Sequence, residues 1–131
     1  MRKIKFRAWS VGTNAGEMIY LDRLNLTGDS VGWADDENGT EYEISDKCPL
    51  MQFTGLFDKS GKEIWEGDIC KYSEWDADCA YGKDESRKKI GEIYWDEIEA
   101  LFSLDRKKNY RMIFDNIEVL GNVYENPELL K

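Results

Sequence analysis

The first residues whose types and spacing could do chemistry form an acidic group in a polar stretch of the chain. Glu74, Asp76 and Asp78 could offer carboxylate oxygens to Ca²⁺ or Mg²⁺. They do not fit the calcium-loop pattern, because counting from Asp76 the glycine position holds Tyr81 and the final glutamate position holds Arg87. A solvated loop therefore explains these carboxylates better than a metal site.

The chain contains no histidine, which removes the commonest proton shuttle at neutral pH. Catalysis by serine or cysteine with a histidine base is excluded, as are Cys₂His₂ zinc sites and haem bound by a proximal histidine. Cys48, Cys70 and Cys79 form no Cys-x-x-Cys pair and are expected to be free thiols. We predict no catalytic residues, no metal and no cofactor. The alternative is a hydrolase that uses paired carboxylates or a thiolate of low pKa.

The charge balance bears on possible partners. The 131 residues include 27 acidic and 18 basic side chains, so the net charge is −9. This charge repels the phosphate backbone at long range, and general binding of nucleic acid is not expected. Two nucleic-acid-related alternatives stay open: a barrel that binds single strands through aromatic side chains, and an acidic surface that imitates DNA and acts on a host DNA-binding protein.

The chain length and the distribution of apolar residues indicate one domain in the cytoplasm. A chain of 131 residues fits a single domain with its own core. No segment approaches the ~20 apolar residues that a membrane-spanning helix needs. The basic amino terminus is not followed by an apolar run of signal-peptide length. We therefore expect no membrane partner.

Aromatic residues make up 13% of the chain, with five tryptophans and seven tyrosines. Such side chains fill cores, form oligomer interfaces or bind ligands, and we favour core or interface over ligand. Five of them are proposed as a possible interaction surface: Trp9, Trp65, Tyr72, Trp95 and Tyr124. Trp9 stands out because the alternation of its strand places it on the polar face.

The amino-terminal part of the chain predicts a hairpin. Apolar and polar residues alternate, with Ile4, Phe6 and Ala8 on one face and Lys3, Lys5, Arg7 and Trp9 on the other. This pattern predicts a strand with one buried face. Glycine and asparagine in 12–16 predict a turn, and 17–21 a second strand. Residues 22–46 predict short strands or irregular structure with a tight turn at Asn38-Gly39.

The centre of the chain predicts three short strands, at 50–54, 62–65 and 69–72. Asp58-Lys59-Ser60-Gly61 predicts a reverse turn in which the aspartate accepts local amide hydrogen bonds and the glycine takes the left-handed conformation. Glu66-Gly67-Asp68 predicts another turn. Extended segments separated by tight turns are typical of a small β-barrel.

The remaining chain predicts a polar loop over 73–89 and further strands over 90–95, 100–104, 110–114 and 117–124. A helix is the alternative for the second of these strands, because Trp95, Ile98 and Leu101 or Phe102 have helical spacing. Ile117, Val119, Gly121 and Val123 are expected on one face of the last strand. Asn126-Pro127 predicts one terminal helical turn, with the asparagine as its cap.

Three separate segments resemble the YopX family, a group of small proteins from bacteriophages and prophages. The segments are Arg2–Trp9 followed by Met18-Ile19-Tyr20, then Met51–Leu56 with Asp58–Ile69, and finally Ile117–Leu130. They occur in the family's order and cover most of the chain. One departure is Trp65, where the family pattern has tyrosine.

The residue pattern and the resemblance together predict a mainly β fold. We expect a single domain over 1–131, with an amino-terminal hairpin and variable region at about 1–49 and an SH3-like, barrel-type core at about 50–131. Long polar loops and a short carboxyl-terminal helical turn complete it. The resemblance implies a phage or prophage origin, a location in the bacterial host cytoplasm, a homo-oligomer and no known reaction. We predict a non-enzymatic, self-associating interaction module, with a host protein as a further possible partner.

Overall fold

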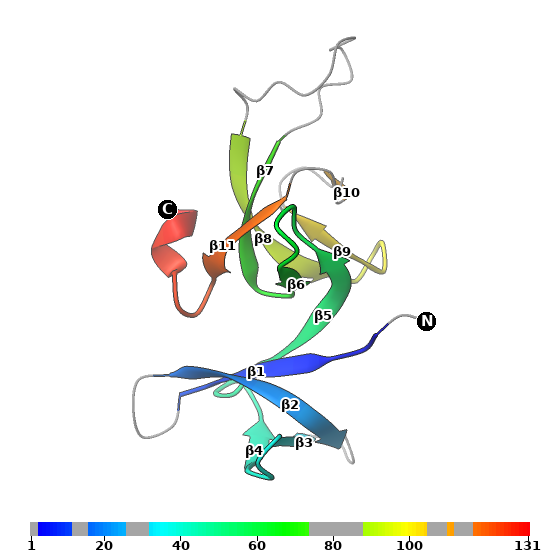
Figure 1. Ribbon diagram of the computed structural model, residues 1–131, viewed down its shortest axis with the longest axis vertical. Coiled ribbons are helices and arrows are strands. Elements are labelled where there is room, and N and C mark those ends of the chain that lie inside the picture. Colours follow the sequence, from blue (N-terminus) through cyan, green and yellow to red (C-terminus); the bar gives the residue numbers. More distant parts are fainter. Residues whose placement is uncertain (1–2, 12–15, 26–31, 74–87, 105–109, 112–116) are drawn as a thin grey trace. The chain divides into compact units, whose positions relative to one another are not determined.

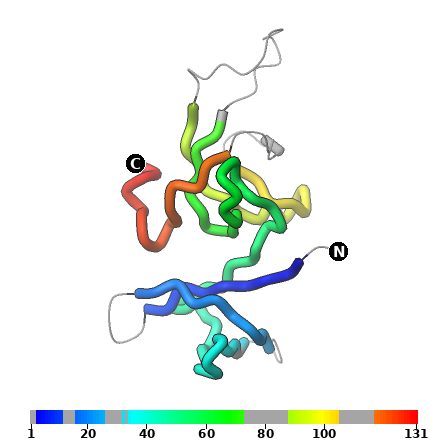
Figure 2. Tube along the Cα trace, viewed as in Figure 1, coloured from blue at the N-terminus to red at the C-terminus, as the bar shows by residue number. Residues whose placement is uncertain are grey.

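A computed structural model describes residues 3–11, 16–25, 32–73, 88–104, 110–111 and 117–131 of the chain. The strands are β1 (Phe6–Ser10), β2 (Glu17–Asn25), β3 (Gly32–Asp36), β4 (Glu41–Ile44), β5 (Leu50–Phe57), β6 (Glu63–Trp65), β7 (Asp68–Ser73), β8 (Lys88–Asp96), β9 (Leu101–Leu104), β10 (Tyr110–Arg111) and β11 (Glu118–Asn122), followed by the 3₁₀ helix η3 (Pro127–Leu130) (Figure 1). Figure 2 follows the same path as a tube. The prediction of a mainly β fold is confirmed, and closure of a barrel stays a prediction.

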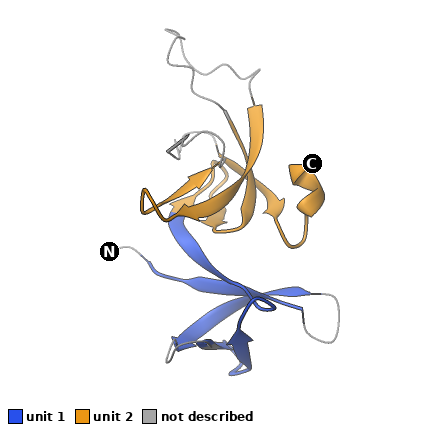
Figure 3. Ribbon diagram, turned by 180° about the vertical axis from the view of Figure 1, so that it is seen from behind, with its two compact units in different colours: residues 1–55 blue, residues 56–131 orange. Residues whose placement is uncertain are grey.

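The chain forms two compact units, Met1–Gly55 and Leu56–Lys131 (Figure 3). The boundary between them lies within β5, a few residues after the position at which the sequence predicts the barrel-like core to begin.

Unit 1 is an antiparallel sheet in which the strands follow the order β4-β3-β2-β1-β5. Ala8 at the centre of β1 pairs with Ile19 of β2 and with Leu50 of β5. Ala8 and Ile19 are both buried. The predicted hairpin of β1 and β2 is therefore confirmed, although residues 12–15 of its turn lie outside the described part of the chain.

The assignment of two faces to the first strand is wrong at two positions. Arg7, expected on the solvent face, is buried, whereas Ile4, expected on the apolar face, is 65% exposed. Arg7 lies opposite Tyr20 and Met51 in the neighbouring strands, and its aliphatic stem suits such neighbours. Ile4 precedes β1 and so has no partner strand in the register.

The variable region of unit 1 contains the hairpin of β3 and β4. Gly39 has φ +77°, and its N–H donates to the Asp36 carbonyl at 3.0 Å. The Asp36 carboxylate also accepts the N–H groups of Asn38 and Thr40, each at 2.9 Å. These bonds form the tight turn that Asn38-Gly39 predicts, since glycine reaches positive φ without steric cost.

Unit 2 contains an antiparallel sheet with the strand order β10-β9-β8-β7-β11. Six buried side chains form its core: Ile64, Cys70, Tyr72, Ile93, Leu104 and Ile117. The strand predicted over 100–104 is confirmed as β9, which pairs with β8. The helical alternative is excluded because Trp95 and Phe102 face each other across this antiparallel pair.

A bulge interrupts β11 between Val119 and Gly121. Such a bulge adds one residue to a strand and shifts the alternation of faces. Consequently Asn122 is buried, and the expectation that Ile117, Val119, Gly121 and Val123 share one face is wrong beyond the bulge.

The terminal turn forms as predicted, but not with the predicted cap. Asn126 makes no side-chain capping bond to η3. Its Oδ1 instead accepts the backbone N–H of Asn122 at 3.3 Å. The asparagine therefore fixes the chain that enters the turn, while Pro127 begins the turn with its φ already restricted.

Several predictions fall on residues outside the described ranges: the loop over 74–87 with its acidic group and Cys79, and most of the strand over 110–114. In the described residues, no helix is long and apolar enough to cross a membrane.

Candidate interaction surface

Two of the five proposed aromatic residues lie in the interior. Trp65 is 3% exposed and Tyr72 is 7% exposed, and Tyr72 belongs to the core of unit 2. The backbone N–H of Trp65 donates to the buried Asp68 carboxylate at 2.8 Å, which closes the turn between β6 and β7. These positions favour the core alternative for both side chains.

Trp9 and Tyr124 are half-buried and lie in different units. The Trp9 indole lies directly against Gly16, where any Cβ would clash with the ring. Tyr124 follows the end of β11, and its N–H donates to Asn122 Oδ1 at 3.1 Å. Trp9 belongs to unit 1 and is therefore not part of a surface of unit 2.

Trp95 is the most exposed of the five, with 43% of its surface open to solvent. It sits near the end of β8, and its ring meets that of Phe102 on β9 edge to face, with centroids 5.0 Å apart. Ile93 and Leu104 form the next pair on the same face of this hairpin, two positions away, and are both buried. The apolar face of the hairpin thus continues from the core to the solvent.

The turn that joins β8 and β9 carries a second exposed apolar side chain. Ile98 is 93% exposed, and Glu97 and Glu99 on either side of it are also exposed. The Asp96 carboxylate accepts the N–H groups of Ile98 at 2.9 Å and Glu99 at 3.1 Å. These bonds fix the backbone on both sides of the exposed isoleucine.

The backbone of this turn is held in an unusual conformation. Ala100 has φ +52°, a region that costs a residue with a Cβ about 1–2 kcal/mol. The Asp96 hydrogen bonds hold the turn in this conformation despite that cost. We call Trp95, Ile98 and Phe102, with the carboxylates of Asp96, Glu97 and Glu99, the hairpin tip.

A second exposed apolar side chain lies toward the other end of β8. Ile90 is 47% exposed, and Lys71 of β7 is its partner in the register. Lys88 lies two residues before Ile90 and therefore on the same face of the strand. We call these three residues the β7–β8 face.

Two carboxylates lie near the β7–β8 face. Glu118 of β11 is opposite Lys71, and it forms an ion pair with Lys59 at 3.2 Å. Glu92 lies two residues after Ile90, on the side nearer the hairpin tip. The face is thus more positive at its Lys88 end than elsewhere.

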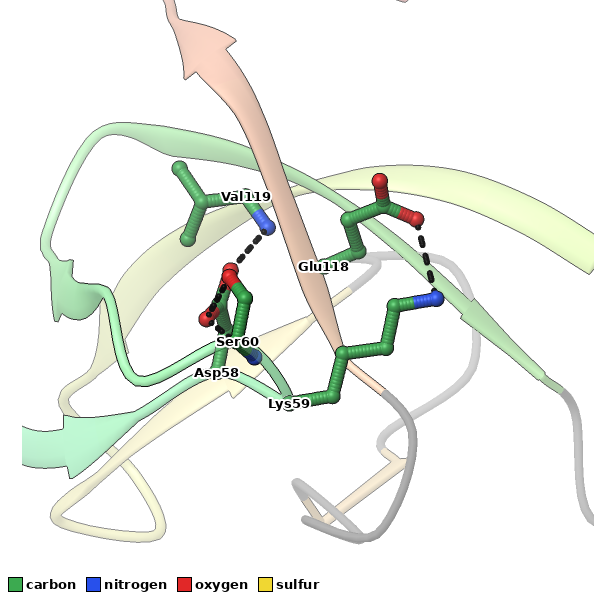
Figure 4. A network of polar contacts seen from close by, with 5 residues as sticks. All are labelled: Asp58, Lys59, Ser60, Glu118 and Val119. Carbon is green, nitrogen blue, oxygen red and sulfur yellow. Dashed lines mark hydrogen bonds and ion pairs between the residues drawn. The ribbon is translucent and has the colours of Figure 1, made fainter.

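A polar network of unit 2 is built around Asp58 (Figure 4). One carboxylate oxygen accepts the N–H groups of Ser60 and Lys62 and the Ser60 hydroxyl, and the other accepts the Val119 N–H at 3.0 Å. Burial alone would raise the pKa of Asp58, but these hydrogen bonds outweigh it and lower the pKa to about 2. The predicted turn is confirmed, with Gly61 at φ +86°.

The two described thiols are buried within the fold. Burial raises the pKa of Cys70 to about 12, and the carboxylates of Asp68 and Asp58 act in the same direction. Burial also raises the pKa of Cys48. Both groups are therefore thiols at neutral pH, whereas a nucleophilic cysteine needs a lowered pKa. In the described part of the chain, no three acidic or cysteine side chains are placed to hold a metal ion.

Comparisons with known proteins identify the family. The model of the YopX protein family matches residues 5–131. The chain belongs to the YopX family. Two solved structures resemble this chain over 100% of both chains: protein EF1440 from Enterococcus faecalis, with 25% identity and a TM-score of 0.62, and protein yopX from Bacillus subtilis, with 21% identity and a TM-score of 0.63. Comparison with curated proteins gave no match.

The three segments that resemble the YopX family have clear structural roles in this member. The first forms β1 and part of β2, the second contains the turn around Asp58, and the third contains β11 and η3. The hydrogen bond from Val119 to Asp58 joins the second segment to the third. Trp65, the departure from the family pattern, fills a buried aromatic position.

Sequence reasoning found Trp95 but missed Ile98 and Phe102 as parts of the same surface. In the sequence, Ile98 and Phe102 indicate only a helix as the alternative, through their helical spacing from Trp95. The available signal was the segment Glu97-Ile98-Glu99, in which a lone isoleucine lies between two glutamates. This segment directly follows Asp96. Asp96 at the start of such a segment favours a turn, and a turn places the isoleucine at the surface.

Proposed function

We propose that this YopX-family protein is a non-enzymatic interaction module that associates with itself and serves phage or prophage biology. The observation that carries the proposal is the hairpin tip, where Trp95 is 43% exposed and Ile98 is 93% exposed on an ordered turn. Exposed apolar groups of this kind, surrounded by polar residues, are typical of interaction sites.

The state of the reactive groups supports binding over catalysis. The Asp58 carboxylate is occupied by backbone and hydroxyl donors, and the thiols of Cys48 and Cys70 are held in the protonated form. These groups therefore serve the fold, and neither the lowered pKa of Asp58 nor the burial of the thiols requires a catalytic explanation.

Static light scattering over a wide range of concentrations tests self-association. We expect the average mass to rise above the 15.3 kDa of one chain as the concentration increases, because association follows mass action. A mass that stays at one chain up to millimolar concentration would refute the proposal.

A second candidate is an acidic DNA mimic that acts on a host DNA-binding protein. The observation that favours it is the hairpin of β3 and β4, where Asp35 lies opposite Glu41 and Glu43 is on the same face of β4. Arg23 of β2 lies on the other side of Asp35 and offsets part of this charge. Competition between this protein and DNA for a host DNA-binding protein at low salt tests the candidate, and mimicry predicts displacement of the DNA.

A further inference from the structure

We infer that the protein self-associates head to tail, with the hairpin tip of one copy seated on the β7–β8 face of a second copy. This inference rests on the proposed self-association and names the two surfaces that make it. Both surfaces belong to unit 2 and lie toward opposite ends of one strand, β8 (Figure 1).

The two surfaces offer complementary anchors. The hairpin tip has Ile98, 93% exposed, and the half-exposed Trp95, while the β7–β8 face has Ile90, 47% exposed. Burial of such side chains against each other is the main favourable term in association. The Asp96 hydrogen bonds hold the tip in place, so little ordering of the backbone opposes binding.

The charges around the anchors select a second copy in this orientation. The tip carries three carboxylates, those of Asp96, Glu97 and Glu99, whereas the β7–β8 face carries Lys71 and Lys88 beside Ile90, with Glu92 on the side nearer the tip. Tip against tip would bring six carboxylates together, whereas the face supplies lysines that can pair with the carboxylates of the tip. Tip against face instead pairs opposite charges, and such complementarity fixes the orientation of an interface.

The arrangement also explains how a chain with a net charge of −9 could associate with itself. The general repulsion between copies is long-ranged and is screened by salt, while the contact itself joins opposite charges. Because the two surfaces are different, the association is heterologous, and it forms either a closed ring or an open chain of copies.

Two single variants and their mixture test the inference. Ile98→Asp disables the tip and leaves the face intact, whereas Ile90→Asp disables the face and leaves the tip intact. Both side chains are exposed, so both variants are expected to fold, which circular dichroism can verify. Sedimentation velocity should show each variant alone as a monomer. The association constant of each variant should be lower than that of the wild type on the order of tenfold or more. An equimolar mixture should form a dimer and nothing larger, because only one intact tip and one intact face remain.

Ile4→Asp is the matched control. Ile4 is also an exposed isoleucine, at 65%, but it belongs to unit 1, and this variant should assemble like the wild type. Charge reversal provides an independent test. Lys71→Glu alone and the double variant Glu97→Lys with Glu99→Lys should each associate weakly, and their mixture should recover association.

The outcomes separate this inference from the proposed function. If the wild type assembles and both isoleucine variants assemble equally well, or if their mixture stays monomeric, the head-to-tail contact is wrong and self-association uses another surface. If the wild type itself is a monomer, both the contact and the proposed self-association are wrong.

Discussion

The Asp58 carboxylate accepts the backbone N–H of Val119 at 3.0 Å, although the two residues are 61 positions apart in the chain. The bond ties the turn between β5 and β6 to β11. A second bond, from the Lys59 N–H to the Ile117 carbonyl at 3.0 Å, joins the same two segments. Local turn chemistry and long-range assembly of unit 2 thus depend on one side chain.

Replacement of this carboxylate should destabilise the protein. Asp58→Asn keeps one acceptor oxygen but puts an NH₂ group in place of the other, so one of the buried donors loses its partner. Loss of such a partner costs about 1–3 kcal/mol. Urea unfolding should show the transition at lower urea concentration. Asp46→Asn, at an exposed position, is the control and should unfold like the wild type.

The contribution of Asp58 should depend on pH in a defined direction. Its pKa is about 2 in the folded protein, below the ordinary value of 3.8. A group with a lowered folded pKa stabilises the fold above its unfolded pKa and loses this effect as the pH falls through the folded pKa. The difference in unfolding midpoint between wild type and Asp58→Asn should therefore be constant above about pH 5 and shrink between about pH 4 and 2.

The pKa of the Asp36 carboxyl is also lowered, mainly because the carboxylate accepts the backbone N–H of Thr40. It is present in both proteins and cancels in the comparison. A midpoint difference that grows as the solution becomes more acidic would contradict the role given to Asp58.

Cys70 should resist thiol reagents in the folded protein. Burial, aided by Asp68 and Asp58, raises the pKa of this thiol to about 12, and the thiolate is the reactive form. Mass spectrometry after labelling with iodoacetamide at pH 8 should find Cys70 unmodified in the native protein and modified in urea. Rapid labelling of Cys70 in the native protein would contradict its buried position. It would instead support the alternative of a hydrolase that uses a thiolate of low pKa.

Gly121→Ala should disturb the terminal turn. A Cβ at this position would clash with the Asn126 side chain, which accepts the Asn122 N–H. Overpacking of this kind costs about 1–3 kcal/mol. The unfolding free energy should fall by that amount in the single variant.

The double variant Gly121→Ala with Asn126→Ala removes the clash and provides the control. It should be more stable than the sum of the two single changes predicts, because the residues interact directly. Additive effects would show that Gly121 and Asn126 are not in contact.

Much of the fold follows from local sequence signals. The turn at Asp58–Gly61 needs an aspartate to accept amide bonds and a glycine at positive φ, and both are visible in the sequence. The positions of strands also follow from the alternation of apolar and polar residues along the chain. The burial of Arg7 could not be predicted in this way, because it depends on Tyr20 and Met51 in the neighbouring strands.

The candidate surface was less accessible to sequence reasoning. Trp65 and Trp95 both follow an isoleucine-containing strand segment, yet one is buried and the other is half exposed. What separates them is position in the sheet: Trp65 precedes a tight turn closed by the buried Asp68, whereas Trp95 lies beside the exposed turn that joins β8 and β9. The bulge at Val119–Gly121 could not be predicted from the sequence either, because it depends on how β11 pairs with β7, a strand distant in the chain.

If this YopX-family protein binds copies of itself through the hairpin tip, loss of the exposed isoleucine should abolish its assembly. Sedimentation equilibrium of the wild type and Ile98→Asp at matched concentrations measures this effect. We predict that the wild type forms assemblies larger than one chain and that the variant stays close to 15.3 kDa. Equal masses for the two proteins, whether both are monomers or both assemble, would contradict the account.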